Sequence, residues 1–264
     1  MSRAFAIPAT GELEKAQEIA RRVEDLGYTT IWSNDTPGAD GIVTAAAMAD
    51  ATETLRVGVG VVAVDRRPPE EISETLRELE IPLDRLVLGV GSGSSPAPLV
   101  TVRRAVAALR DLLGPEPKIA VAAMGPQMCR LAGKVADTVL FNWMTPERLT
   151  WAADRVAEGV RRSGRDGGPE RAAYVRCAIG TAAAERVAAE AAKYNRYPAY
   201  TRHFTAMGAP LRTVGVTGDG SDFTARLADY DSVLDEVVVR ALPESNSVAS
   251  TLAVAEASAP VNRT

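Results

Sequence analysis

Short apolar segments alternate with amphipathic segments along the whole chain. In the segment 12–26, Leu13, Ala16 and Val23 recur at the spacing of one helix face, and Gly27 follows as a stop signal. Apolar segments of six to nine residues, many of them rich in β-branched side chains, separate such helices. This alternation predicts a regular succession of strands and helices.

Eight strands and the helices between them are expected from this pattern. The expected strands are 3–8, 29–34, 55–62, 85–90, 118–123, 136–141, 172–180 and 235–241. The expected helices are 12–26, 42–51, 70–79, 97–113, 126–134 and 145–162, then helical material over 182–230 broken at Pro198 and Pro210, and a final Ala-rich helix. Strands that alternate with helices pair in parallel through right-handed crossovers.

The predicted architecture is a single α/β domain over residues 1–264, a (β/α)₈ TIM barrel. The strands are continuous apolar runs, as buried parallel strands are. Eight strand–helix units suffice to close a barrel, and barrels of this length are common as one domain. An open doubly wound sheet is the alternative.

Composition excludes several classes of function. The 264 residues are 46% apolar and carry a net charge of −4, which suggests neither a nucleic-acid nor a membrane partner. No apolar run approaches the roughly 18 residues of a membrane helix, and the N-terminus lacks a signal-peptide pattern. Cys129 and Cys177 form no disulfide framework, so we expect a cytoplasmic protein. With one histidine, His203, no metal site is expected, and we place His203 at the surface or in a loop.

The ends of the strands are the informative positions, because barrel active sites lie there. These ends are small, apolar and Gly-rich, which suits a flat ring against backbone better than acid–base hydrolysis. The run Gly89–Gly93 invites a dinucleotide-binding interpretation, but Ser94 stands where the third glycine belongs. We therefore expect a tight turn that lets a ligand approach the backbone closely.

Five segments resemble luciferase-like monooxygenases and their deazaflavin-dependent branch. They cover most of the chain in the right order: 18–35 (EIARRVEDLGYTTIWSND), 53–61 (ETLRVGVGV), 84–93 (DRLVLGVGSG), 118–147 (KIAVAAMGPQMCRLAGKVADTVLFNWMTPE) and the eighth strand. The longest, 118–147, is similar to the branch that includes methylenetetrahydromethanopterin reductase-like proteins.

The resemblance implies that coenzyme F-420, or alternatively FMN, binds at the mouth of the barrel. It places the ring on a cis peptide between Gly60 and Val61. It also implies a homodimer, for which the apolar helix 42–51 is a further motive. It assigns no catalytic residue. The implied cofactor-binding residues are Asp35, Gly60, Val61, Gly91, Ser92, Gly93, Ala123, Met124, Gly125, Pro126, Asn142 and Trp143.

The sequence departs from the family pattern at three places. Thr36 stands where many relatives have a histidine, and Ser94 stands where sugar-phosphate dehydrogenase relatives have an acid. The segment between the fourth and fifth strands is a single helix instead of a longer insertion. These departures argue against glucose-6-phosphate dehydrogenase activity and identify the chain as a shortened member.

Several residues also have a purely structural interpretation. Trp32 and Trp143 fit cofactor stacking or rim packing equally well, and Asp35 fits a turn without a ligand. Cys129 is expected in the core, and the Arg66–Arg67 turn in solvent.

Three functions remain open at this point. The first is an oxidoreductase that moves hydride between F-420 and a small organic substrate. The second is an FMN-dependent monooxygenase. The third is a barrel that binds a cofactor or metabolite without turnover.

Overall fold

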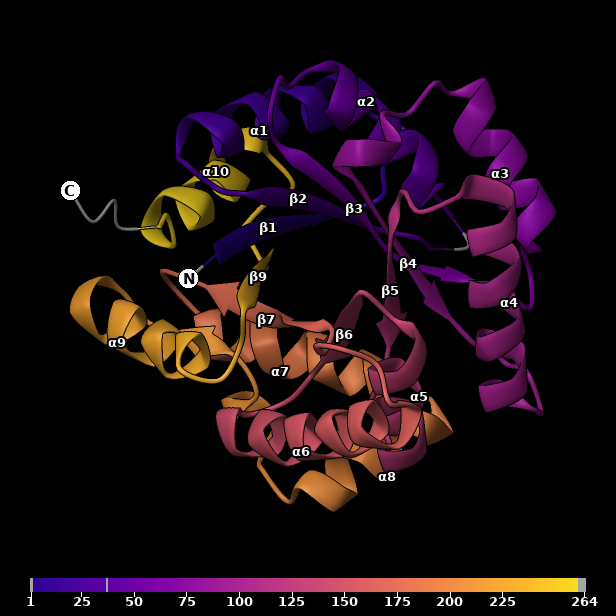
Figure 1. Cartoon of the computed structure of the whole chain (residues 1–264). Helices are drawn as coiled ribbons and strands as arrows, with labels where there is room; N and C mark the ends of the chain where they lie inside the picture. Colours follow the sequence, from indigo (N-terminus) through magenta and orange to yellow (C-terminus); the bar gives the residue numbers. More distant parts are fainter. Residues whose placement is uncertain (1, 37, 261–264) are drawn as a thin grey trace.

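The structure, a computed structural model, describes residues 2–36 and 38–260. Helices surround a closed sheet of parallel strands (Figure 1). The strands are β1 (Ser2–Pro8), β2 (Thr30–Asn34), β3 (Arg56–Ala63), β4 (Leu86–Gly91), β5 (Lys118–Ala122), β6 (Thr138–Asn142), β7 (Glu170–Ala178), β8 (Val216–Thr217) and β9 (Glu236–Ala241). The helices are α1 (Leu13–Asp25), α2 (Gly41–Asp50), α3 (Pro69–Glu78), α4 (Pro98–Leu113), α5 (Pro126–Val135), α6 (Pro146–Ser163), α7 (Ala183–Tyr194), α8 (Pro198–Met207), α9 (Gly220–Asp231) and α10 (Val248–Ala257).

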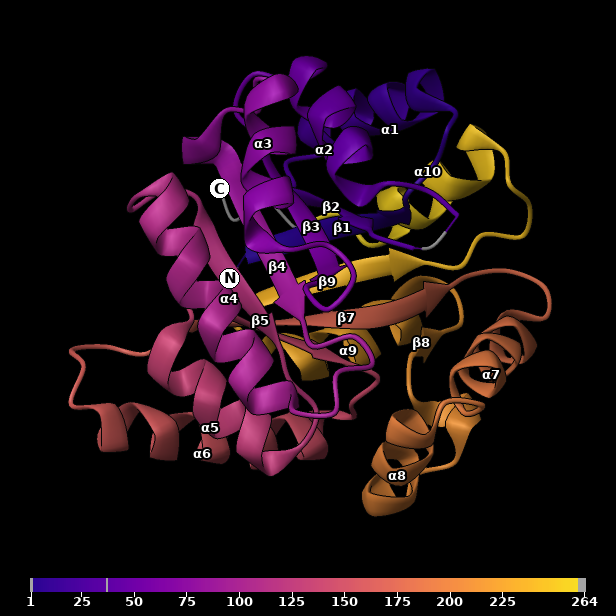
Figure 2. The same ribbon diagram turned by 90° about the vertical axis from the view of Figure 1, so that its right-hand side faces the viewer.

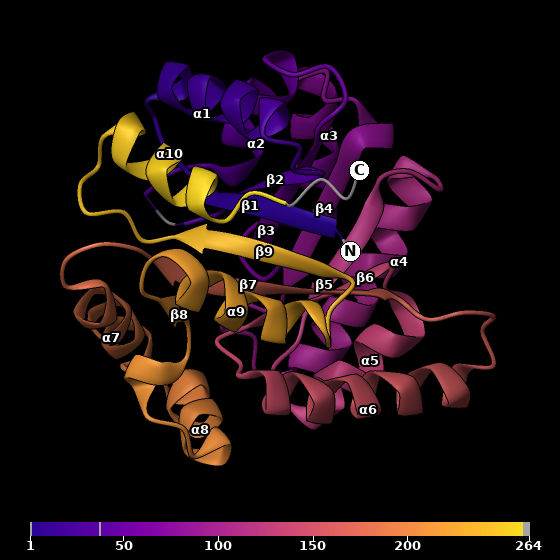
Figure 3. The same ribbon diagram turned by 90° about the vertical axis from the view of Figure 1, so that its left-hand side faces the viewer.

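The barrel closes between β7 and β9 instead of between consecutive strands. Strands β1 to β7 follow one another in order, and β9 pairs with both β1 and β7. In Figure 3, β9 lies between β1 and β7. The eighth expected strand is therefore β9, and the (β/α)₈ TIM barrel is confirmed.

The two-residue strand β8 is the element that the sequence pattern missed. It pairs only with the carboxyl end of β7, at Cys177 and Ala178, and takes no part in closing the barrel. Its residues lie in the segment for which helix was expected. Two residues carry too little alternation to be distinguished from a loop.

Two apolar layers hold the barrel together. The larger layer lies between the strands and the surrounding helices and includes Ile31, Val57 and Leu88. A smaller cluster fills the inside of the barrel, with Trp32 and Tyr174 as its largest members. A β-carbon at Gly58 would lie 2.3 Å from the Trp32 ring. Glycine at this position therefore makes room for the indole, and Trp32 packs inside the barrel.

The apolar helix α2 is explained by packing within the chain. Nearly all of its side chains are buried, with Ile42, Ala45 and Met48 fully covered. It packs against α1 and β3. Its apolar character therefore gives no reason to expect a partner subunit. Among the described residues, no helix combines the length and hydropathy that crossing a membrane requires.

Candidate active site

The predicted cofactor-binding residues come together on one half of the barrel rim. They follow five neighbouring strands, β2 to β6, whose carboxyl ends lie on the same side because the strands are parallel. In the side view of Figure 2, α7 lies beyond the arrowhead of β7, and α8 lies below it. The strand order thus gathers segments that are about a hundred residues apart in the sequence.

The end of β3 forms the floor of this half. The peptide bond between Gly60 and Val61 is cis, as expected, and the register with β4 shifts between Val59 and Val62. Val61 packs against the cluster inside the barrel. A β-carbon at Gly91 would lie 2.9 Å from Val61 Cγ2. Gly91 therefore makes room for Val61. A planar ligand bound at this point would contact the Val61 side chain.

The loop after β4 is held by an acid that the sequence analysis did not single out. The backbone N–H of Ser94 donates to Asp65 Oδ2 at 2.7 Å. Gly93 has a φ of +55°, and a β-carbon there would lie 1.7 Å from Asp65 Oδ1. Ser92 and Gly93 therefore owe their position to the loop after β3. Ser94, noted above as a departure, contributes its backbone to this contact.

The loop after β5 leads directly into α5. Ala123 is buried, Met124 is partly exposed, and Gly125 and Pro126 are exposed at the start of the helix. No side chain caps this N-terminus. The first backbone N–H groups of a helix are unpaired within it and carry a partial positive charge, so this end of the rim favours an anionic group.

Trp143 lies beneath α7 and α8 and is only 1% exposed. Its ring meets Tyr194 and Phe204 edge-on, at centroid distances of 5.5 and 5.9 Å. Its carbonyl oxygen pairs with His203 Nε2 at 2.8 Å. Rim packing is therefore the interpretation that the structure supports for Trp143. The expectation of a surface histidine was wrong, because α8 turns His203 inward, where burial lowers its pKa.

Asp35 has a local partner at the end of β2. Its Oδ1 accepts the backbone N–H of Gly41 at 3.0 Å, and Arg66 lies 4.0 Å from Oδ2. Burial raises the pKa of Asp35, although the Gly41 contact opposes this. Both Asp35 and Arg66 line a cavity of about 390 Å³ at this edge. Asp35 thus anchors the start of α2 and borders the rim.

The turn after β3 and Cys129 complete the comparison with the sequence. We expected Arg67 to be in solvent, and this was wrong. Its guanidinium pairs with Asp40 at 3.0 Å and with Glu71 at 3.3 Å. Arg66 is half exposed. Cys129 is buried in the core, as predicted.

The other half of the rim contains polar residues that the sequence analysis missed. Arg240 Nε donates to Asn34 Oδ1 at 2.8 Å, and Asn34 Nδ2 donates to the Gly60 carbonyl at 2.9 Å. The Tyr174 hydroxyl donates to the same carbonyl at 3.3 Å. Arg176 donates to Asn142. A signal was present in the sequence: each arginine is the one charged residue within an apolar stretch, as in Tyr-Val-Arg-Cys and Val-Val-Arg-Ala.

A cavity of about 600 Å³ opens on this half, between the ends of β1 and β9, α7 and the start of α10. Arg240 lines it, together with charged side chains of α1 and α7. Its volume is within the range of small-molecule sites. Amide, phenol and guanidinium groups can bind and orient a ligand. Fold and rim together define a barrel built to hold a small molecule across the carboxyl ends of its strands.

The model of the luciferase-like monooxygenase family matches residues 1–111 and 97–255, so the chain belongs to this family. A 5,10-methylenetetrahydromethanopterin reductase from Methanolobus tindarius is 27% identical over 186 residues, which are 58% of this chain and 57% of that protein. The match thus spans little more than half the length of this curated relative.

Two solved structures share the fold over nearly the whole chain. An F-420-dependent secondary alcohol dehydrogenase, in complex with an F-420–acetone adduct, superposes with a TM-score of 0.79 at 17% identity and 97% coverage of both chains. The oxygenating constituent of 3,6-diketocamphane monooxygenase from Pseudomonas putida, in complex with FMN, gives 0.74 at 13% identity, with 98% of this chain and 96% of that chain covered. Both confirm the fold.

Proposed function

We propose that this protein is an oxidoreductase that transfers hydride between coenzyme F-420 and a small organic substrate. The observation that carries the choice of cofactor is the match to the 5,10-methylenetetrahydromethanopterin reductase, because a tetrahydromethanopterin reductase from Methanopyrus kandleri with the same fold depends on coenzyme F-420. The F-420 complex of the dehydrogenase with the same fold supports it. When bound, coenzyme F-420 would supply the hydride chemistry, and the residues of the rim would hold and orient it.

The residues of the rim fit such a cofactor. Val61 and Met124 offer apolar surface to a flat ring, and glycine at position 91 leaves the valine its place. The uncapped start of α5 suits the anionic tail that a deazaflavin carries. In this proposal the cofactor-binding residues are the twelve given by the resemblance, with Trp143 acting through packing. Hydrogen bonds from Asn34 and Tyr174 to the Gly60 carbonyl hold the floor beneath the ring.

The cofactor choice is tested by titrating F-420 and FMN against the protein while following fluorescence. Deazaflavin is expected to bind more tightly than FMN, and equal or stronger FMN binding overturns the choice. Anaerobic loss of the absorbance of oxidised F-420, with a panel of alcohols, then tests turnover. Binding without any reduction favours the third function, a barrel without turnover.

The variant Gly91→Leu tests the position of the site. Leucine pushes Val61 toward the mouth, so F-420 binding is expected to be abolished while the fold is kept. The matched control is Gly168→Leu, because Gly168 is exposed in the loop before β7, at the other end of the barrel. Circular dichroism checks folding in both variants. Unchanged F-420 binding by folded Gly91→Leu contradicts the proposed site.

An FMN-dependent monooxygenase is the second candidate, favoured by the FMN complex of the diketocamphane enzyme. Oxygen consumption with reduced FMN, together with an oxygenated product, identifies it. For either activity we propose one domain over residues 1–264 and a cytoplasmic location. We also propose a homodimer, and this last proposal rests on the resemblance alone. Light scattering at micromolar concentration tests the dimer, and a monomer mass contradicts it.

A further inference from the structure

Two arginines stand side by side on the inside of the barrel mouth. Arg176 of β7 and Arg240 of β9 are register partners on neighbouring parallel strands. Side chains alternate along a strand, and Tyr174 and Val238, two residues earlier, lie in the cluster inside the barrel. Both guanidinium groups therefore project to the same interior face. Like charges placed opposite one another on a sheet are destabilising.

The hydrogen-bond partners of this pair are neutral. Arg176 donates to the Asn142 side chain, and its guanidinium lies 4.0 Å from the centre of the Trp143 ring. Arg176 is 3% exposed, and its Nε is buried without a hydrogen-bond partner. Arg240 donates to Asn34 and to the carbonyl of Ala241. Among the described residues, the hydrogen bonds of both arginines go to amide and carbonyl oxygens.

Burial and like charge both act on Arg240. Burial, followed by the neighbouring Arg176, lowers the pKa of the Arg240 guanidinium. Glu190 of α7 is the acid whose charge opposes this effect, but Glu190 pairs with Lys193 at 3.7 Å. A buried charge without an acidic partner costs stability unless a ligand supplies the opposite charge. A bound anion would supply the charge that this pair lacks.

The cavity beside Arg240 is lined by more positive than negative side chains, as an anion site would be. Its lining includes four cationic side chains (Lys15, Arg186, Lys193 and Arg240) and two acids (Glu12 and Glu190), an excess of two positive charges. Both acids are neutralised locally, since Glu12 pairs with Lys15 at 2.7 Å and Glu190 with Lys193. Arg186 points its donors at backbone carbonyls. Arg240 is left as the cation at the inner end of the cavity.

We propose that the substrate of this enzyme carries an oxyanion, a carboxylate or phosphate, which Arg240 binds directly and Arg176 supports from behind. The redox part of this statement rests on the proposed function, whereas the anion site does not. Guanidinium groups bind carboxylates and phosphates through two parallel hydrogen bonds, which also fix orientation. The anion would lie between β1 and β9, opposite the half of the rim assigned to the cofactor ring.

Thermal unfolding with malonate as the probe, at constant ionic strength held by sodium chloride, tests the anion site without cofactor. Malonate at about 100 times its Kd is expected to raise the Tm of the wild type by roughly 5 °C. The same shift is expected for Arg202→Gln, which removes an exposed arginine of α8 outside the cavity. Arg240→Gln is expected to show no shift, and without malonate to have a Tm ~2–4 °C above the wild type.

A second, more conservative variant at position 240 keeps the test valid if Arg240→Gln does not fold. Arg240→Lys keeps the charge but loses the planar fork, so malonate is expected to bind about 10-fold more weakly. Equal malonate shifts in all four proteins overturn the proposal.

The titration of F-420 separates the two possible sources of the anion. If Arg240→Gln binds F-420 as the wild type does, the anion belongs to the substrate, as proposed. If Arg240→Gln instead loses F-420 affinity, the anion is the cofactor's own tail and the proposal falls. If F-420 does not bind the wild type while the malonate shift depends on Arg240, the proposed function falls and the anion site stands.

The last test compares the rates of F-420 reduction by charged and uncharged substrates. Hydroxy acids are expected to reduce F-420 with a kcat/KM on the order of 10²-fold above that of their methyl esters. Arg240→Gln is expected to remove this preference. Equal rates for acids and esters in the wild type overturn the proposal.

Discussion

Among the residues that the structure describes, each end of the barrel interior carries two cationic side chains, but only one end carries acids that pair with them. At the amino ends of the strands, Arg56 and Lys118 face Glu170 and Glu236. At the carboxyl ends, Arg176 and Arg240 face asparagine side chains. The same barrel thus holds a balanced network below and an excess of positive charge above.

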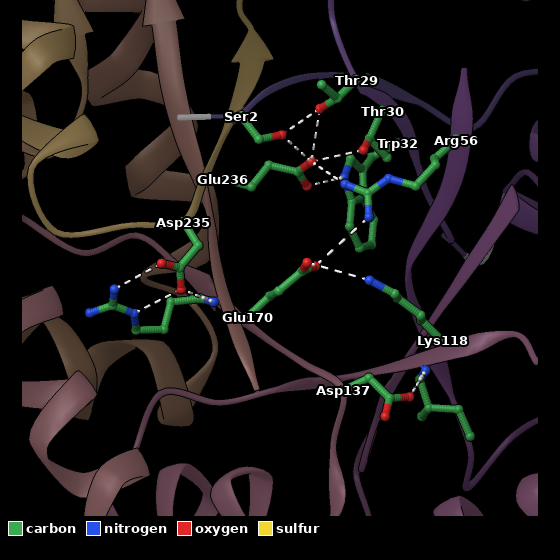
Figure 4. Close-up of polar contacts among 12 residues, drawn as sticks. Ser2, Thr29, Thr30, Trp32, Arg56, Lys118, Asp137, Glu170, Asp235 and Glu236 are labelled. Carbon is green, nitrogen blue, oxygen red and sulfur yellow. Dashed lines mark hydrogen bonds and ion pairs between the residues drawn. The ribbon is translucent and has the colours of Figure 1, made fainter. Parts of the chain in front are cut away.

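The lower network explains how β9 completes the barrel. Figure 4 shows Glu236 surrounded by donors from β1, β2 and β3. Its Oε1 accepts from Thr30 at 2.8 Å and from Arg56 at 3.0 Å, and Glu170 links Arg56 to Lys118 at 3.8 and 3.4 Å. Such a closed set stabilises the barrel by itself. The upper pair lacks this closure, which indicates that one end serves stability and the other serves a ligand.

Glu236→Gln provides the largest expected effect. The change leaves Arg56 without its buried carboxylate partner and disturbs several hydroxyl donors at once. Breaking a buried pair from one side commonly costs 3–5 kcal/mol, and because Arg56 is partly exposed we expect about 3 kcal/mol. Urea unfolding followed by circular dichroism measures this loss in the free energy of unfolding.

The matched control is Glu170→Gln in the same network. The Glu170 side chain is 46% exposed, so its ion pairs are screened by water and their loss is expected to cost less than ~1 kcal/mol. Equal losses for the two variants contradict the assignment of Glu236 as the centre of the network. A loss at Glu236 is also opposite in sign to the gain expected for Arg240→Gln at the other end.

Two aspartates sharpen the comparison through pH. Asp235 lies just before β9 at the lower end, where hydrogen bonding to Arg171 lowers its pKa. Asp35 lies at the upper rim, where burial raises its pKa. A lowered acid pKa adds stability above the unfolded value of about 3.9, and this stability is lost as the pH falls through the folded pKa. A raised acid pKa costs stability as the pH rises through the folded pKa.

Asp235→Asn is therefore expected to lower stability at pH 7, by less than ~1 kcal/mol because the Arg171 pair is partly exposed. Asp35→Asn is expected to raise stability at pH 7, since the amide oxygen still accepts the Gly41 N–H. Asp235→Asn should not differ from the wild type below the folded pKa of Asp235, and Asp35→Asn should not differ below the unfolded aspartate pKa of about 3.9. Thermal unfolding between pH 3 and pH 7 measures both, and the same sign for the two variants refutes this account.

The sequence predicted the barrel and half of its rim for a physical reason. Buried parallel strands are apolar throughout, so the strand ends could be predicted directly. Glycines marked the end of β3 and the loops after β4 and β5. The roles of the glycines could not be predicted, because the space beside Gly58 and Gly91 is filled by Trp32 and Val61, each on a neighbouring strand.

Residues on the other half of the rim required the register of the closed barrel. Arg176 and Arg240 are 64 positions apart, and only the pairing of β7 with β9 places them together. Likewise, the burial of Trp143 and His203 depends on how α7 and α8 fold back over the end of β6. A lone arginine in an apolar strand is the local signal that could have directed attention to this half.

A crystal structure of the protein with F-420 and malonate tests the central claim most directly, because it shows which charges the upper end of the barrel accepts. The account predicts the deazaflavin ring over Val61, with its tail toward the start of α5. It also predicts a malonate carboxylate on the Arg240 guanidinium, in the cavity between β1 and β9. A ring bound outside the mouth, or Arg240 without an anion at saturating malonate, would contradict the account.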